Sequence, residues 1–116
     1  WSGDSVSKFD VDHAIPFSLW GNNDLWNLLP ASPKVNNAKR DRLPTRPLIE
    51  RRRHAIVKAW EMLFEAERGL FLEHAGSFTG LHVQDFGRRE QDDLFSTFKD
   101  AVEYTARNRV AERWAG

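Results

Sequence analysis

Polar and apolar residues alternate over 8–13, the stretch KFDVDH, and this period of two predicts a short β-strand with one apolar face. Pro16 lacks a backbone N–H donor and ends that strand. A loop punctuated by Gly-Asn-Asn-Asp at 21–24 follows, and a second short strand is predicted over 26–29, closed by Pro30. This part of the chain therefore predicts two strands joined by a long loop.

A short helix is predicted after the second strand. Ser32 followed by Pro33 provides an N-cap hydroxyl before a proline at the first helical position, and Pro44 stops the helix. We therefore expect a helix over 33–42. The predicted order is strand, long loop, strand and short helix.

Two longer helices are predicted in the remainder. Thr45 caps the first, in which apolar residues recur at helical spacing down to about His74. Such a helix is long for a domain of this size, so we expect either a break near Gly69 or a projection toward a partner. A loop is expected over 76–80, and then a helix over 88–114. The apolar face of that last helix comprises Leu94, Phe98, Ala101, Val102, Thr105 and Val110.

Composition narrows the class of protein. Of the 116 residues, 41% are apolar and 29% charged, which is typical of a soluble globular domain, and no apolar run approaches a membrane span. The lack of cysteine excludes disulfides, Cys-based zinc sites and Cys nucleophiles, and the four scattered histidines give no support for a zinc cage, so no structural zinc is expected. We expect a cytoplasmic protein. The chain begins with Trp1, so we also expect a fragment of a longer polypeptide.

The net charge of zero hides a strong asymmetry. Segment 34–58 carries nine Lys or Arg against two acidic residues, a net charge of +7, whereas 1–33 carries −3 and 59–116 carries −4. A positive block of this kind is typical of a phosphate-binding surface. An ordinary solvated helix face is the alternative interpretation.

One set of residues in the N-terminal part suggests shared chemistry. Asp12 and His13 are neighbours on the first strand and can converge on one site only if the strand ends there, because successive side chains point to opposite faces. A lone histidine is more often structural, but Asn27 follows His13 by 14 residues and Asn36 follows it by 23. A carboxylate and an amide oxygen are hard ligands suited to Mg²⁺ or Mn²⁺. Two protein ligands suit a catalytic ion, which completes its shell with water and substrate phosphate, and a nearby imidazole can serve as a base.

The motif Asp12-His13, Asn27 and Asn36, followed by Lys39, resembles the HNH, or ββα-metal, nuclease family in an HNN variant. The spacing is similar to that of the HNH domain of RNA-guided CRISPR nucleases. The resemblance covers residues 8–42 and agrees with the predicted strand–loop–strand–helix order.

The resemblance implies a role for each motif residue. His13 would be the general base that deprotonates water, and Asp12 and Asn36 would hold one divalent cation at the scissile phosphate. Asn27 would orient the loop and the His13 ring. Lys39, Arg40 and Arg42 would contact the nucleic-acid backbone, a role that their charge also indicates. The positive charge of the segment adds Lys34, Arg46, Arg51 and Arg52 as candidate phosphate contacts. For the arginines at 51 and 52, a solvated position is the alternative.

The chain departs from the family pattern in two respects. Many members carry a histidine at the third motif position, where this chain has Asn36, and many carry paired CxxC zinc knuckles, which this chain lacks. The helices after Pro44 would then have to supply the core. Asn37 competes with Asn36 for the ligand role, because the two differ by 100° on a helix, and the spacing from Asn36 to Lys39 favours Asn36.

We therefore expect an α+β fold: a ββα-metal (His-Me finger) unit over 7–44 and two long helices over 45–116, in one HNH domain spanning 1–116. The expected function is metal-dependent DNA endonuclease activity, increasing with pH through about 6 to 7 because the base must be neutral. The expected setting is a prokaryotic or phage restriction or CRISPR defence protein, in which a guide-RNA complex or another domain of the same chain supplies specificity. The alternatives are a module that binds nucleic acid without cleaving it and a helical interaction module within a larger defence complex.

Overall fold

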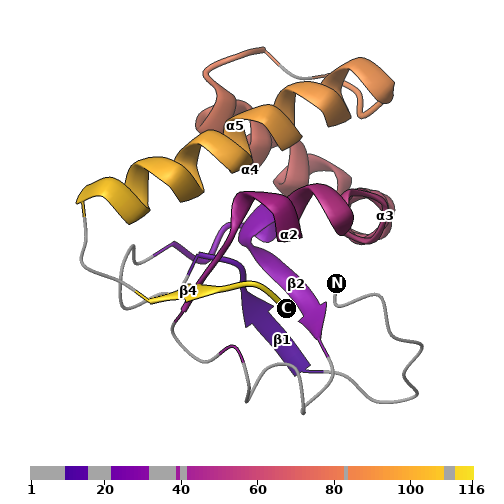
Figure 1. The fold of residues 1–116 in the computed structure, drawn as a ribbon. Helices are drawn as coiled ribbons and strands as arrows, with labels where there is room; N and C mark the ends of the chain where they lie inside the picture. The colour runs from indigo at the N-terminus through magenta and orange to yellow at the C-terminus, as the bar shows by residue number, and fades with distance from the viewer. Residues whose placement is uncertain (1–9, 16–21, 32–38, 40–41, 83, 109–111) are drawn as a thin grey trace.

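The computed structural model of the chain describes all residues except 1–9, 16–21, 32–38, 40–41, 83 and 109–111 (Figure 1). The described elements are β1 (Asp10–His13), a 3-10 turn (Leu25–Asn27), β2 (Leu28–Ala31), β3 (Leu43–Pro44), α2 (Arg46–Arg51), α3 (Arg53–Ala66), α4 (Arg68–Thr79), α5 (Arg88–Asn108) and β4 (Arg113–Trp114). The predicted α+β class is confirmed, with helices in the majority and two small sheets. None of the described helices is long and apolar enough to cross a membrane.

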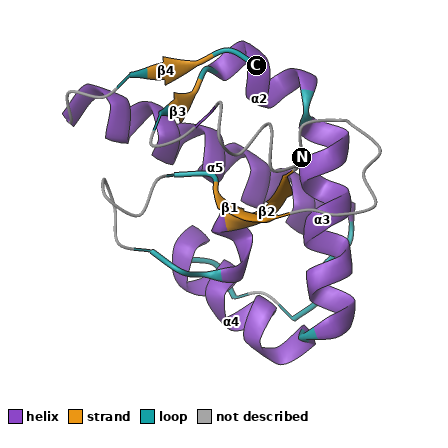
Figure 2. Ribbon diagram, turned by 90° about the horizontal axis from the view of Figure 1, so that it is seen from below, coloured by secondary structure: helices purple, strands orange, loops and turns teal. Residues whose placement is uncertain are grey.

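The two sheets have two strands each and lie apart from one another (Figure 2). β1 and β2 are antiparallel, with Asp12 opposite Leu29 and His13 opposite Leu28. The second strand, predicted over 26–29, begins two residues later than expected. Residues 25–27 form a 3-10 turn, and the strand starts at Leu28. Pro30 does not close this strand but lies within it. In a two-stranded sheet each strand is an edge strand, so the missing N–H of a proline is tolerated.

The short helix predicted over 33–42 lies mostly outside the described residues. Lys39 is helical, and Arg42 already lies in the non-helical segment that precedes β3. The helix that would complete a ββα-metal unit is therefore not described.

The helix predicted to run from Thr45 to about His74 is three helices. Its N-cap is confirmed, because the Thr45 hydroxyl accepts a hydrogen bond from the Leu48 N–H at 3.4 Å. The helical path breaks at Arg52, between α2 and α3, and again at Glu67, whose φ of −138° and ψ of 59° are not helical. The break expected near Gly69 therefore occurs two residues earlier.

The C-terminal part differs from the prediction at two places. Residues 76–79 are helical rather than a loop, since α4 continues to Thr79 and ends at Gly80, whose left-handed φ of 73° favours glycine. α5 ends at Asn108 rather than at Trp114. Trp114 lies instead in β4, pairs in parallel with Pro44 and buries its side chain. The apolar residue at the end of the predicted helix is therefore buried through a contact distant in the sequence.

The helices α3, α4 and α5 lie on one side of the β1–β2 pair (Figure 1). Their aromatic side chains enclose Trp26, which is fully buried, stacks on Phe78 at 3.8 Å between ring centroids, and packs edge-on against Phe98. The Trp60 indole donates a hydrogen bond of 2.8 Å to the Trp26 carbonyl. Since Trp26 immediately precedes Asn27, the helical core holds one of the motif residues in place.

Candidate active site

β1 ends at His13. Asp12 and His13 can serve one site only if the strand ends there, so this requirement is met. Asp12 is only 5% exposed, whereas His13 is half-buried at the end of the strand. The structure brings both residues together with Asn27 and Lys39, two polar residues that are themselves fully buried. The candidate site thus consists of a buried polar cluster, formed by Asp12, Asn27 and Lys39, and the half-buried imidazole of His13.

The Asn27 side chain binds backbone on both sides of the loop. Its Oδ1 accepts a hydrogen bond from the Ile15 N–H at 2.8 Å, and its Nδ2 donates to the carbonyls of Ile15 at 3.1 Å and Asn22 at 3.0 Å. The Asn27 carbonyl also accepts a hydrogen bond from the Ala14 N–H at 2.9 Å. One buried amide thereby holds the chain just after His13 against the loop that returns to β2.

The His13 ring has a partner that the sequence analysis missed. Its Nε2 lies 2.7 Å from Oδ1 of Asn23, an exposed residue in the loop before the 3-10 turn. The sequence pattern Gly-Asn-Asn-Asp at 21–24 predicts only a turn. The available sequence signal was the asparagine itself, whose amide oxygen can accept a hydrogen bond from an imidazole.

Lys39 is oriented inward. Its ammonium group lies 3.4 Å from Oδ1 of Asp12 and donates a hydrogen bond of 2.9 Å to the His13 carbonyl. A fully buried cation of this kind must be paired, because desolvating an isolated charge is expensive. Lys39 therefore neutralises Asp12 and ties the end of β1 to the segment after β2. Its predicted contact with a DNA backbone stays a prediction.

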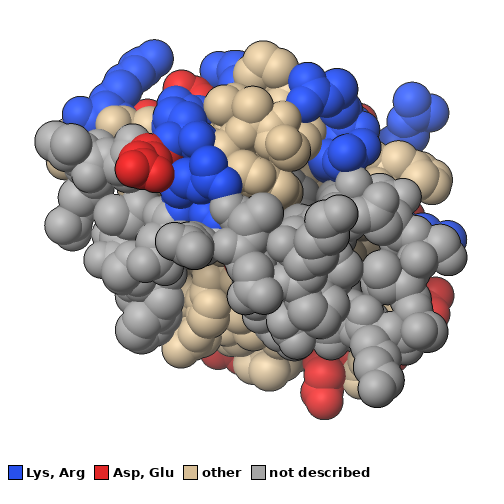
Figure 3. Space-filling model, turned by 60° about the horizontal axis from the view of Figure 1, so that its bottom comes forward, with Lys and Arg blue, Asp and Glu red and all other residues tan. Residues whose placement is uncertain are grey.

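The other predicted cations lie in several environments. Lys34 and Arg40 lie outside the described residues, as does the predicted metal ligand Asn36. Arg42 is half-buried, and its Nε donates to the Lys39 carbonyl at 3.1 Å. Arg46 and Arg51 are exposed on α2, and Arg52 is half-buried between α2 and α3. In Figure 3, Lys and Arg side chains gather along one margin of the displayed face.

The described residues contain no group of three or more His, Cys, Asp or Glu side chains placed to hold a metal ion. Asp12 is the predicted metal ligand that the structure describes. Its carboxylate is a hard oxygen donor of the kind that Mg²⁺ prefers. The donor set therefore fits an ion such as Mg²⁺, which keeps several waters and takes few protein ligands.

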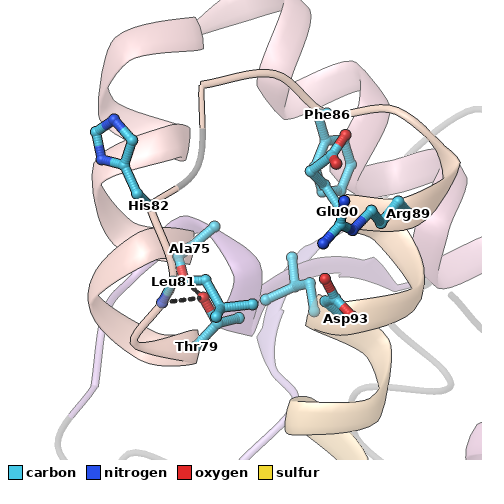
Figure 4. A pocket seen from close by; sticks show the side chains of 9 residues that line it. Ala75, Thr79, Leu81, His82, Phe86, Arg89, Glu90 and Asp93 are labelled. Carbon is cyan, nitrogen blue, oxygen red and sulfur yellow. Dashed lines mark hydrogen bonds between the residues drawn. The ribbon is translucent and has the colours of Figure 1, made fainter.

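The three remaining histidines lie on α3, on α4 and in the segment after α4. His54 and His82 are exposed, and His82 pairs with Gln84 at 2.8 Å. His74 of α4 accepts a hydrogen bond from the Leu25 N–H at 3.1 Å, so this histidine contributes to the structure by joining α4 to the 3-10 turn. A pocket of about 250 Å³ between α4 and α5, near His82, contains none of the predicted site residues (Figure 4).

Comparison with the curated proteins and with the solved structures gave no match. The family comparison did give one, over the segment that contains β1, β2 and the buried polar cluster. Residues 4–45 match the sequence model of the HNH endonuclease family, which supports the HNH interpretation of the motif and, in general terms, a nuclease function.

Proposed function

We propose that the chain is a metal-dependent DNA endonuclease in which His13 is the general base and Asp12 and Asn36 hold one divalent cation. The observation that carries the proposal is the end of β1, where a half-buried imidazole directly follows a buried carboxylate. The buried Lys39 side chain contacts the Asp12 carboxylate and the His13 carbonyl, and the buried Asn27 side chain holds the backbone of Ile15, two residues after His13. This arrangement is preorganised, as catalysis by positioned groups requires.

His13 performs the proton transfer. Its neutral ring accepts a proton from a water molecule while the water oxygen forms a bond to phosphorus. The bond from phosphorus to the 3′ oxygen breaks, and the electron pair leaves with that oxygen, which is then protonated from solvent. The strand is nicked, with the water oxygen retained on the phosphate.

A divalent cation would supply electrostatic stabilisation of the charge that develops on the phosphate and on the leaving oxygen. Asp12 suits the ligand role because its carboxylate is buried and negatively charged. Lys39 lies beside that carboxylate, and it holds the end of β1 through its hydrogen bond to the His13 carbonyl.

Binding of the DNA backbone is proposed for the exposed arginines of α2, Arg46 and Arg51, together with Lys34, Arg40, Arg42 and Arg52. These residues belong to the +7 segment, and Arg46 and Arg51 are exposed. Phosphate contacts of this kind position a duplex without reading its sequence. We propose that sequence choice comes from a guide-RNA complex or from another domain of a cytoplasmic defence protein.

The test is nicking of supercoiled plasmid by the purified 116-residue chain in Mg²⁺ or Mn²⁺. His13→Ala should abolish nicking, and EDTA should do the same. His54→Ala is the matched control, since it removes an exposed histidine from α3 and should leave nicking unchanged. Circular dichroism checks that each variant is folded.

The outcomes separate the proposal from its alternative. Nicking that persists in His13→Ala would refute the role of His13 as base. A folded parent chain that binds DNA in a salt-dependent manner but does not nick it would replace the nuclease with a non-cleaving binding module.

A further inference from the structure

The Asn23 side chain contacts the His13 ring, with Oδ1 2.7 Å from Nε2. The family motif assigns no role to this position. Asn27, to which the motif gives the orienting role, directs its amide to the backbone of Ile15 and Asn22 instead. The work of the two asparagines is thus divided: Asn27 holds the backbone, and Asn23 contacts the ring.

Asn23 is exposed, but both of its neighbours are fixed. The Asn22 carbonyl accepts a hydrogen bond from the buried Asn27 amide, and the Asn22 Oδ1 accepts one from the Asp24 N–H at 2.8 Å. The Asp24 carboxylate in turn accepts hydrogen bonds of 3.3 Å from the Asn22 amide and from the Trp26 indole. Asn23 therefore lies in a closed turn that is attached to the core.

The α4 helix anchors the same loop. The Leu25 N–H donates to Nδ1 of His74, and Nε2 of His74 lies 3.8 Å from Oδ1 of Asp24. The backbone that carries Asn23 is consequently held to the segment after β1 through Asn27 and to the helical part through His74. A side chain presented from such a support can orient a neighbouring ring at little entropic cost.

We propose that Asn23 is a positioning residue for the His13 base in the proposed nuclease reaction, on which this inference rests. An amide oxygen can only accept a hydrogen bond, so Nε2 of a neutral His13 must carry the proton. Nδ1 then carries the lone pair and is the nitrogen that takes the proton from water. Asn23 thereby sets both the tautomer and the angle of the ring.

The first test observes the contact without relying on cleavage. In ¹⁵N-labelled chain at about pH 8, where free imidazole is neutral, the Nε2-bound proton of His13 should give an observable signal because its hydrogen bond slows exchange with water. His13→Ala assigns the signal. Asn23→Ala should remove it, and Asn108→Ala, which changes an exposed asparagine on α5, should not. A signal unchanged in Asn23→Ala, or a proton on Nδ1 in the parent chain, would overturn the inference.

The second test is kinetic. Asn23→Ala should lower kcat for nicking by roughly tenfold to a hundredfold while KM changes less than about twofold, because the ring loses orientation but the DNA contacts remain. Asn23→Asp keeps an oxygen acceptor at the same position and should restore kcat to within about threefold of the parent value. An unchanged kcat in Asn23→Ala, or no rescue by Asn23→Asp, would overturn the positioning role.

The two tests also distinguish failure of the positioning role of Asn23 from failure of the proposed nuclease function. If the parent chain does not nick DNA but Asn23→Ala still removes the Nε2 proton signal, the proposed function fails while the orientation of the ring by Asn23 stands. If the parent nicks DNA and Asn23→Ala affects neither the signal nor kcat, the nuclease stands and the role of Asn23 fails.

Discussion

Replacing Asn27 by alanine tests how the site is supported. The change removes three hydrogen bonds made by a fully buried side chain, to Ile15 N, Ile15 O and Asn22 O, with lengths of 2.8, 3.1 and 3.0 Å. The Asn27 carbonyl that accepts from Ala14 is retained. The variant therefore isolates the contribution of the side-chain amide.

The expected cost follows from the groups left behind. A buried N–H that loses its acceptor costs about 1–3 kcal/mol, and each carbonyl that loses one of its donors costs about 1 kcal/mol or less. We expect a loss of about 3 kcal/mol in the free energy of unfolding. For a domain of this size that corresponds to a decrease of roughly 10 °C in Tm.

The assay is urea unfolding followed by tryptophan fluorescence, with Asn108→Ala as the matched control. The slope of unfolding free energy against urea should not change, so the difference lies in the midpoint. A loss below about 1 kcal/mol would mean that the three hydrogen bonds do not stabilise the folded chain as reasoned, since even one orphaned buried N–H should cost that much.

Asn27→Asp sharpens this prediction through its pH dependence. The introduced carboxylate keeps an acceptor for the Ile15 N–H but faces the two carbonyls that the amide bound, so its pKa is raised above the usual value of about 3.9. A carboxyl with a raised folded-state pKa destabilises the protein fully above that pKa, and the cost decreases as the pH falls toward the unfolded value. Asn27→Asp should therefore be less destabilised at pH 5 than at pH 8, whereas the cost of Asn27→Ala should be constant.

Three further predictions concern charged residues. Lys39→Met should cost about 3–5 kcal/mol in thermal unfolding, because it removes the described cation beside the buried Asp12 carboxylate, and adding Asp12→Asn should recover part of that loss. The ion pair with Lys99 lowers the pKa of Glu50 below 4.5, but Glu50 is 46% exposed. Glu50→Gln should therefore cost at most about 0.5 kcal/mol at pH 7. A lowered pKa contributes stability above the unfolded value that is lost as pH falls through the folded one, so this difference should vanish in acid. Arg51→Ala should weaken DNA binding equally for duplexes of different sequence and reduce the slope of log affinity against log salt by about one, as measured by fluorescence polarisation.

Sequence patterns alone predict those features whose physical cause lies within a few residues. The alternation before His13 predicts β1, and the Thr45 hydroxyl predicts the start of α2 because a capping hydrogen bond reaches only three residues ahead. The α+β class follows from the same kind of local pattern. The HNH-like spacing is also visible in the sequence, although it joins residues as far apart as Asp12 and Asn36.

Tertiary structure decided which polar residues are buried and what they bind. No local pattern predicts that Lys39 is buried, yet it alone among the described cations of its segment is fully buried, because it packs against the end of a strand 26 residues earlier. Trp114 extends a helical pattern in the sequence but lies in β4. Its partner in the sheet, Pro44, is 70 residues earlier, so no local pattern predicts this pairing. Asn23 looks like one more turn residue until the loop folds back on His13. Such contacts depend on how the helices and strands pack, and therefore on residues that no local pattern connects.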